Sequence, residues 1–532
     1  MNATRAFIVF TLVAICALGV FAQSKFLRKY SLTQTTGDAS TLPPSNSISL
    51  INTQDSTLWI GTSKGAAKST NYGTSWKSYQ SNPAFANDGI YALATRGDTV
   101  WTSTGYDKEI TDGTIQTGSG FAFSTNAGLT WQHMSQPLDR RGDSIISYNN
   151  GINDSVYILP VTVLEANVTY DIALSPGTVW IASWSSGLRK RTYTDSAWQR
   201  ILLPPDNRSS LSPTDTLWSY APKDTLRQRR IFQRFNPVPE DNLKAFAVCA
   251  VGSDTIWCGT AGGVNKSTDG GVSWTRITHH NQLSSIMGDW VIAVREQRYA
   301  NVSRIWTTNW TKPNTDDEYG VSYTDDGGAT WKNLLNGIKA YDFAFKDSIA
   351  YIATDNGVYR TPDGGLSFTR VSYMADPDIR QAITSPAVFS VSVLADTVFV
   401  GTGDGLASTI DNDTHNFGSA WKIYRAYQQV GSSNLTYAYP NPFSPSSEIV
   451  RIHYGSQNSS GNSQVSVSID IFDFGMNRVR TLINNVTRSG SEFDEIWDGR
   501  DDHGRLVANG TYFYRLRLEN QDPQFGKILV LQ

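Results

Sequence analysis

Short runs in which apolar and polar residues alternate recur along most of the chain. A small polar turn ends each run and a second run follows, as in Ile90-Tyr-Ala-Leu-Ala and then Asp98-Thr-Val-Trp-Thr-Ser-Thr. β-branched and aromatic residues at a period of two are typical of strands, and Gly-Asp or Asp-Ser turns between them are typical of hairpins. The second run is found seven times, centred on Trp59, Trp101, Trp180, Trp257, Trp306, Tyr351 and Phe399.

A second phrase follows most of these runs. Ser69-Thr-Asn-Tyr-Gly-Thr-Ser-Trp76 is one of five good copies, and all five resemble the Asp-box (bacterial neuraminidase) repeat, S-x-D-x-G-x-T-W. The Asp or Asn is suited to bond nearby amides, Gly to take a positive φ and Trp to pack between sheets. The resemblance implies a structural turn remote from any active site, built on Asn71, Trp76, Asn126, Trp131, Asp269, Trp274, Asp326, Trp331, Asp363 and Phe368.

Together the two phrases predict an all-β fold. Seven sets of four short strands over residues 46–427, at irregular periods, indicate a seven-bladed β-propeller, with six or eight blades as alternatives. Residues 23–45 would precede it as an N-terminal segment that adds an outer strand or covers the closure.

The pattern changes after a polar linker at 428–434. About seven short strands in residues 435–532 fit an immunoglobulin-like sandwich. Tyr439-Pro-Asn-Pro-Phe443, Trp497-Asp-Gly-Arg-Asp-Asp-His-Gly504 and Val507 to Leu516 resemble the FlgD-type Ig-like module and the C-terminal sorting domains of type IX secretion cargo. This resemblance implies outer-membrane secretion machinery as a partner. The final Gln532 departs from the usual basic last residue, so a plain spacer remains the alternative.

The N-terminus has the character of a signal peptide. Arg5 precedes an apolar stretch from Ala6 to Val20, and Val20-Phe-Ala22 suits cleavage near Ala22. This stretch is too short for a membrane helix, and no other stretch is long enough. We therefore expect residues 1–22 to be removed, and the mature chain to be secreted or held on the outer cell surface without a membrane span.

Composition narrows the function classes. The net charge of −3 and the 17% of charged residues argue against nucleic acid as a partner. Cys249 and Cys258 lie in two runs joined at Gly252-Ser-Asp254. A two-residue loop would place the two cysteines opposite one another, which allows either a disulfide or two buried thiols. No metal site and no cofactor are expected, since His279 and His280 are the nearest histidines.

Four long insertions would emerge on one face of the propeller. Strands within a blade alternate in direction, so 105–120 and 309–319 (between second and third strands) share a face with 133–168 and 199–243 (between blades). Long loops on a rigid scaffold are where binding tends to occur. The candidate binding residues in or beside these loops are Trp218, Tyr220, Trp310, Arg229 and Arg230.

Signals for catalysis are weaker. The Arg-Ile-Pro signature expected of a sialidase is missing from the sequence. Xyloglucanase-like hydrolases use two facing carboxylates, for which Asp171 and Asp342 on innermost strands, and Asp88 and Asp289 at the starts of two others, are candidates. The alternative is that these aspartates face a channel or bond to neighbouring backbone. The sequence thus favours a non-catalytic propeller that binds a glycan or extracellular protein, over a glycoside hydrolase or an extracytoplasmic assembly or stability factor.

Overall fold

The computed structural model describes residues 39–531 except for 41, 87, 111–112, 149–153, 216–217, 219, 221–239, 379–380, 384, 427–435, 447, 456–463, 490–491 and 520. The expected signal peptide 1–22 and the linker 428–434 lie outside the described residues. Where the chain is described, its regular structure is strand, apart from short 3₁₀ turns such as Pro83–Phe85 and Asp241–Leu243. None of the helices in those parts is long and apolar enough to cross a membrane. The all-β prediction is confirmed.

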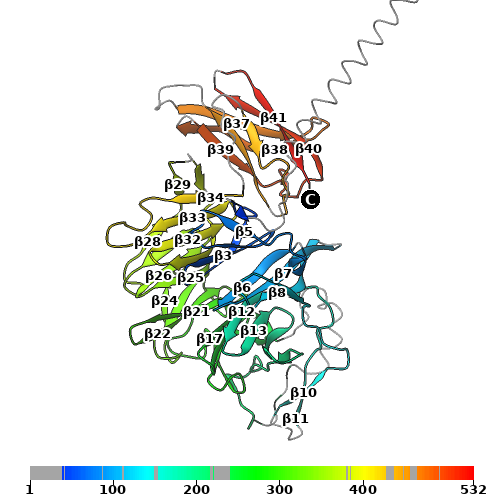
Figure 1. Cartoon of the computed structure of the whole chain (residues 1–532), viewed down its shortest axis with the longest axis vertical. Coiled ribbons are helices and arrows are strands. Elements are labelled where there is room, and N and C mark those ends of the chain that lie inside the picture. Colours follow the sequence, from blue (N-terminus) through cyan, green and yellow to red (C-terminus); the bar gives the residue numbers. More distant parts are fainter. Residues whose placement is uncertain are drawn as a thin grey trace, which may run out of the picture. The chain divides into compact units, whose positions relative to one another are not determined.

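Seven antiparallel sheets follow one another along the chain, each with its four main strands in sequence order (Figure 1). We number them sheets 1 to 7. Sheets 1 to 3 contain β2 (Ile48–Gln54), β3 (Thr57–Thr62), β4 (Gly65–Ser69) and β5 (Trp76–Ser78); β6 (Gly89–Arg96), β7 (Thr99–Ile110), β8 (Gly113–Ser124) and β9 (Gln132–Met134); and β12 (Thr169–Ser175), β13 (Thr178–Ser183), β14 (Gly187–Thr192) and β15 (Gln199–Arg200).

Sheets 4 to 7 repeat the arrangement. They contain β17 (Ala245–Val251), β18 (Thr255–Thr260), β19 (Gly263–Ser267) and β20 (Trp274–Ile277); β21 (Trp290–Tyr299), β22 (Val302–Trp310), β23 (Gly320–Thr324) and β24 (Lys332–Leu334); β25 (Ala340–Lys346), β26 (Ile349–Thr354), β27 (Gly357–Thr361) and β28 (Thr369–Val371); and β31 (Val388–Leu394), β32 (Thr397–Thr402), β33 (Gly405–Ile410) and β34 (Lys422–Tyr424).

Short strands decorate this core. β1 (Ala39–Ser40) pairs with β5 at the outer edge of sheet 1, and β16 (Ser210–Leu211) pairs with β20 in the same way. Two hairpins lie in connections between sheets: β10 (Ile145–Tyr148) with β11 (Asp154–Tyr157), and β29 (Met374–Asp376) with β30 (Gln381–Ile383).

The first strands of the seven sheets surround a common channel, and sheet 7 packs against sheet 1. The Thr53 hydroxyl donates to the Val393 carbonyl at 2.7 Å, and the Tyr424 hydroxyl donates to the Tyr72 carbonyl at 3.0 Å. Ile48 and Phe399 belong to one buried cluster. Among the described strands no sheet closes on itself, so side chains rather than a shared strand join the last sheet to the first. This is a propeller arrangement.

A repeated turn joins the third strand to the fourth in five sheets. In each copy a Ser or Thr hydroxyl accepts the glycine amide at 2.8–2.9 Å, and the Asp or Asn Oδ1 accepts the amide four residues on at 2.9 Å. We call these the Asx turns. Trp76 and Trp274, which follow two of them, are 1% and 2% exposed, so each turn directs a ring into the core.

Lysines on the third strands fix three of the five Asx turns to the preceding sheet. Lys68, Lys190 and Lys266 lie 5.2–5.3 Å from the ring centres of tryptophans on the neighbouring second strands. Their Nζ atoms donate to carbonyls of the next Asx turn, Ala127, Gly270 and Gly327, at 2.7–3.0 Å. The repeated phrase thus holds adjacent sheets together as well as turning the chain.

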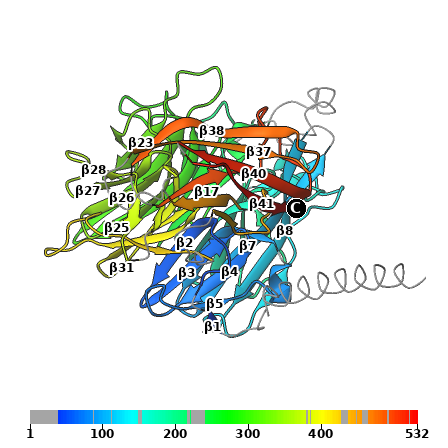
Figure 2. The same cartoon turned by 90° about the horizontal axis from the view of Figure 1, so that it is seen from above.

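Residues 437–530 form two further antiparallel sheets around a separate core. Figure 2 shows the strands of the larger of these sheets in orange and red. One has the order β35-β36-β39 and the other β38-β37-β40-β41. Trp497, Tyr514 and Ile469 are fully buried between them. The strands are β35 (Tyr437–Tyr439), β36 (Val450–Gly455), β37 (Gln464–Phe472), β38 (Arg478–Ser489), β39 (Glu492–Trp497), β40 (Gly510–Leu518) and β41 (Gln524–Val530).

Candidate functional site

The first strand of every sheet is bulged at the same place. The pairing register with the second strand shifts across Ser49, Tyr91, Tyr170, Phe246, Ile292, Tyr341 and Phe389. Five of these seven residues are aromatic. A bulge leaves an extra residue out of the ladder and turns its side chain away from the regular alternation. Here it does so at the start of the strand, on the face where connections between sheets arrive.

The bulged residues and their neighbours form two runs of ring contacts, from Tyr91 to Trp290 and from Trp310 to Phe389, which we together call the aromatic arc. It comprises Tyr91, Tyr170, Trp184, Phe246, Trp290, Trp310, Tyr319, Tyr341 and Phe389, each partly exposed. Ring centres are 6.5 Å apart for Tyr91–Tyr170, 6.0 Å for Tyr170–Phe246 and 6.2 Å for Phe246–Trp290. Trp290 and Trp310 are register partners across β21 and β22, and Trp310–Tyr341 and Tyr341–Phe389 are both 5.7 Å apart. The arc therefore passes over sheets 2 to 7.

Polar groups fix the orientation of several arc rings. The Tyr170 hydroxyl donates to Gln116 Oε1 at 2.6 Å, and the Trp310 indole N–H donates to the Ala340 carbonyl at 2.8 Å. Lys339 Nζ lies 3.8 Å from the Trp310 ring centre. Burial raises the pKa of Tyr170 to about 12, so its hydroxyl is a hydrogen-bond donor at neutral pH. Rings held in this way lose little side-chain entropy when a ligand stacks on them.

The long connections surround the arc. The hairpin of β7 and β8 contacts the connection between sheets 2 and 3, where Lys108 Nζ lies 2.5 Å from Glu165 Oε1. Lys312, between β22 and β23, pairs with Asp241 in the connection before sheet 4. These contacts place the insertions together, as strand alternation predicts. Sequence analysis placed Trp310 beside these loops but did not identify the arc as a whole, although aligning the seven first strands shows the recurring aromatic position.

The other predicted binding residues are placed differently. Tyr220 is 6% exposed and donates to the Leu203 carbonyl at 2.6 Å. Trp218 packs edge-on against Tyr148 and Tyr220, with ring centres 5.8 and 5.6 Å away. Both residues therefore hold loops onto the scaffold, and Tyr220 presents no ring to a ligand. Arg229 and Arg230 lie outside the described residues.

Asp171 and Asp342 face the channel, a cavity of about 360 Å³ lined by all seven first strands. Arg295 lies between them, with its Nη1 2.8 Å from Asp171 Oδ2 and its Nε 3.4 Å from Asp342 Oδ1. Asp171 also accepts the amides of Ile172 and Val248 at 3.0 Å. These contacts join sheets 3, 4, 5 and 6, which agrees with the alternative that the aspartates bond to neighbouring backbone.

Electrostatics distinguishes the members of this triad. Burial raises the pKa of Asp342 to about 6, although the positive charge of Arg295 opposes the shift. Burial alone would lower the pKa of Arg295. The negative charges of Asp171 and Asp342 outweigh this effect, so the pKa of the arginine is raised. Asp342 Oδ1 has no hydrogen-bond partner among the described residues, so Arg295 contacts it as an ion pair only.

The remaining candidate carboxylates lie at strand starts. Asp289 Oδ1 accepts the His279 amide at 2.8 Å, and burial raises the pKa of this carboxyl. Burial also raises the pKa of Asp88, against a hydrogen bond from Ser119. The partner of Asp289 lies in the same connection, whereas Ser119, the partner of Asp88, lies on β8.

The two cysteines are free, and their expected register is wrong by one residue. Cys249 pairs with Trp257, while Cys258 pairs with Val248. The loop between Val251 and Thr255 has three residues rather than two, with Gly252 at a φ of 75°. The side chains of Cys249 and Cys258 therefore lie on opposite faces of sheet 4. Burial raises the pKa of Cys249 to about 12, so it is an inert thiol.

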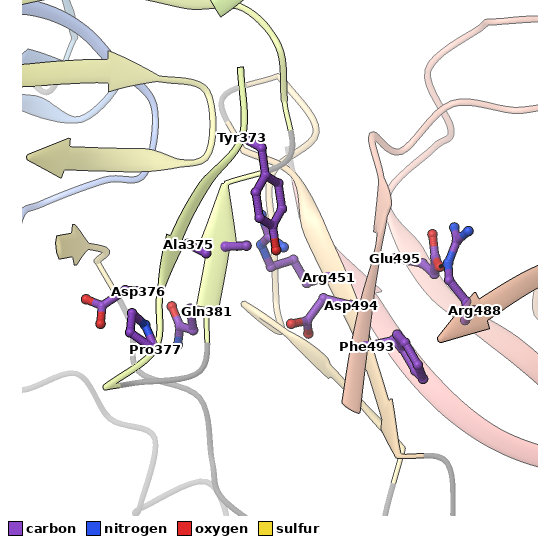
Figure 3. Close-up of a pocket in the computed structure, with 11 residues that line it drawn as sticks. Tyr373, Ala375, Asp376, Pro377, Gln381, Arg451, Arg488, Phe493, Asp494 and Glu495 are labelled. Atoms are coloured by element: carbon purple, nitrogen blue, oxygen red, sulfur yellow. Dashed lines mark hydrogen bonds and ion pairs between the residues drawn. The ribbon is translucent and has the colours of Figure 1, made fainter. Parts of the chain in front are cut away.

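A second cavity, of about 460 Å³, lies between hairpin β29–β30 and the C-terminal strands β36, β38 and β39 (Figure 3). Arg451 at its edge donates to Asp404 Oδ1 at 2.8 Å, and Arg488 donates to Glu495 at 2.7 Å. Acidic and basic side chains both line it, so its charge does not select an ion of one sign. The contacts link the C-terminal strands to the same face that carries the arc.

Comparisons with known proteins concern the fold. No protein-family model matches the chain. A C5a peptidase of Streptococcus pyogenes is 23% identical over 215 residues, which is 39% of this chain but only 16% of that protein.

Solved structures are more extensively similar. A GH74 enzyme of Niastella koreensis covers 94% of this chain and 75% of its own, with 14% identity and a TM-score of 0.46. YCF48 bound to D1 peptide covers 72% and 99%, with 12% identity and a TM-score of 0.39. PorZ, a surface component of the type-IX secretion system of Porphyromonas gingivalis, covers 91% and 65%, with 13% identity and a TM-score of 0.32.

Proposed function

We propose that the chain is an exported, non-catalytic, seven-bladed propeller that binds a glycan or an extracellular protein on the aromatic arc. The arc is the observation that carries this proposal. Partly exposed rings over six adjacent sheets, several of them held by the scaffold, suit stacking on sugar faces or docking of apolar side chains. Their position among the long connections adds loops that would close around a ligand.

Among these ligands, a neutral glycan fits the arc best. Several charged side chains around it are already paired, including Lys108 with Glu165 and Lys244 with Asp241 at 2.6 Å. Such pairs have little free charge to offer a charged partner. Tyrosine hydroxyls and ring faces instead match the hydroxyl edges and C–H faces of sugars.

The C-terminal strands would serve secretion or surface attachment, as their resemblance to FlgD-type and sorting modules suggests. The chain with and without residues 435–532 would be expressed in a bacterium that has a type IX system. We expect the intact chain outside the outer membrane and the shortened chain in the periplasm. Equal external amounts of both would leave the plain-spacer alternative.

A binding assay with glycans tests the main proposal. Residues 23–532 would be titrated with neutral plant and microbial oligosaccharides, alongside Trp310→Ala and Tyr91→Ala variants. We expect each variant to bind at least about tenfold more weakly, equivalent to about 1.4 kcal/mol. Phe474→Ala, which removes a ring that is 79% exposed in the C-terminal strands, is the matched control and should bind like the wild type. Unchanged affinity in both arc variants would contradict the proposal.

Hydrolysis is the second candidate, and the raised pKa of Asp342 favours it. A carboxyl that titrates near pH 6 suits a general acid. The same oligosaccharides would be analysed for products by mass spectrometry with wild type and Asp342→Asn. Products that disappear in the variant would establish catalysis and overturn the non-catalytic proposal.

A further inference from the structure

Two loops on the arc face bring together three side chains that can ligate a metal. His279 and His280 lie between sheets 4 and 5, and Asp316 lies between β22 and β23. One ligand atom from each falls within 4.8 Å of the other two. We propose that His279, His280 and Asp316 form a binding site for a divalent transition-metal ion of the zinc type. Sequence analysis expected no metal site, and the fold brings Asp316 beside His280 although the two are 36 residues apart in the sequence.

His279 is already oriented as a ligand. Its Nδ1 lies 2.7 Å from the Ile286 carbonyl oxygen, which can only accept, so Nδ1 carries the proton. Nε2 is then left with its lone pair for a metal. A carbonyl behind a ligating imidazole is the usual outer-shell partner, because it fixes both the tautomer and the ring orientation.

The loop that carries His279 is braced at several points. The His279 amide donates to Asp289 Oδ1 at 2.8 Å, and Asn281 Nδ2 donates to the Arg276 carbonyl at 2.8 Å. Asn333 Nδ2 reaches across from β24 to the Ser285 carbonyl at 3.1 Å. A braced loop lowers the ordering cost of binding.

His280 and Asp316 supply the adaptable half of the site. His280 Nε2 lies 2.8 Å from Asp316 Oδ1, and the two side chains are 64% and 71% exposed. Ligand atoms around tetrahedral zinc are roughly 3.4 Å apart, given bonds of about 2.1 Å. Small rotations of these exposed side chains would bring the three ligand atoms to that spacing.

The donor set selects the class of metal. Two imidazoles and one carboxylate suit Zn²⁺, Ni²⁺ or Cu²⁺, whereas Ca²⁺ and Mg²⁺ prefer all-oxygen sites. Three protein ligands leave at least one coordination position open. Since Asp289, which holds the His279 amide, directly precedes Trp290, the open position would lie near the middle of the arc.

Calorimetry with Zn²⁺ alone tests this site without any glycan. Untagged residues 23–532, stripped with chelator, would be titrated with ZnCl₂ and NiCl₂, and with CaCl₂ and MgCl₂ as selectivity controls. We expect one zinc per chain and at least about a 100-fold loss of affinity in His279→Ala and in His280→Ala. Asp316→Asn should weaken binding less, because an amide oxygen remains.

His415→Ala is the matched control, since His415 is an exposed histidine in sheet 7 that bonds Asn412 and Thr414 instead. It should bind zinc like the wild type, and all variants should share its melting temperature in chelator. Zinc binding that persists unchanged in His279→Ala/His280→Ala, or its absence from the wild type, would overturn the proposal. Either result leaves the glycan assay unaffected, so the two proposals fail separately.

Discussion

At the residue scale, Asp171, Arg295 and Asp342 form a triad in the channel, and these three side chains join several sheets. Arg295 pairs with two carboxylates that come from positions 124 and 47 residues away, and Asp171 also accepts a backbone amide of the next sheet. The first strand of each sheet is an edge strand that lines the channel. Its backbone amides on that side have no neighbouring strand to pair with, so they need other hydrogen-bond partners. The sequence showed Asp171 and Asp342 on innermost strands, but the arginine between them depends on how three bulged strands rotate, which residue patterns do not encode.

Stability should depend on pH through Asp342. Its folded pKa of about 6 lies above the ordinary 3.8, so the proton is bound more tightly in the folded state. The stabilisation is complete below about pH 4 and is lost as pH rises through 6. We expect the melting temperature of Asp342→Asn, relative to wild type, to be higher at pH 8 than at pH 4.

Asp522→Asn, at an exposed carboxyl, supplies the comparison for that experiment. Its melting temperature should follow the wild type at both pH values. If the melting temperatures of wild type and Asp342→Asn changed in parallel with pH, the pKa of the Asp342 carboxyl would be an ordinary one, and the prediction would be wrong.

The Asx turns should respond to acid in the opposite sense. Hydrogen bonds from the Ser367 hydroxyl and amide lower the pKa of Asp363 to about 2. Its contribution is present above the ordinary pKa and is lost as pH falls through 2. Asn71 and Asn126 take the same place in sheets 1 and 2, so Asp363→Asn should keep the turn but remove its acid dependence between pH 4 and 2. The melting temperatures of wild type and Asp363→Asn, measured between pH 4 and 2, test this prediction. An equal loss of stability in both proteins would contradict it.

At the element scale, the strands and turns could be predicted from the sequence because both depend on the chemistry of residues close together in the chain. Alternation gave the strand positions, and Ser, Asp and Gly spacing gave the Asx turns. Register was less predictable: one extra residue in the Gly252 loop moved both cysteines. The aromatic arc was missed for a related reason, since a bulge turns a side chain out of the alternation that sequence reasoning assumes.

Two glycines at similar φ angles separate backbone strain from packing. A Cβ on Gly128 (φ 79°) would lie 2.6 Å from the Trp59 ring, whereas one on Gly252 (φ 75°) would meet nothing within 4 Å. We expect Gly252→Ala to cost about 1–2 kcal/mol from conformation alone. Gly128→Ala should cost a further ~1–3 kcal/mol because the ring must move. Urea denaturation measures the free energy of unfolding of both variants. Equal losses would show that the Trp59 ring moves aside at little energetic cost.

At the scale of the whole molecule, buried charges connect sheet 7 to the C-terminal strands. Asp404 is fully buried and pairs with Arg425 at 2.9 Å and with Arg451. Lys64 and Glu448 form a second contact at 2.5 Å, but Lys64 is 36% exposed. Sequence analysis treated the two regions as separate domains, because contacts between distant side chains leave no periodic pattern.

Removing the buried partner should matter more than removing the exposed one. Asp404→Ala leaves two arginines buried without their carboxylate and should cost about 3–5 kcal/mol. Lys64→Met should cost less than about 1 kcal/mol. Limited proteolysis near residue 430 and thermal melting would report both. Equal sensitivity in the two variants would mean that Asp404 does not hold the C-terminal strands in place.

The way in which sheet 7 meets sheet 1 has a consequence for biogenesis. Each of the seven sheets takes its four main strands from one uninterrupted stretch of chain, and β1 only extends the outer edge of sheet 1. A polypeptide threaded N-terminus first through a translocation pore can therefore complete one sheet after another as it emerges. The last event is the docking of two finished surfaces. Among the described strands of the seven sheets, none is left unpaired and prone to aggregation until a partner hundreds of residues later is made.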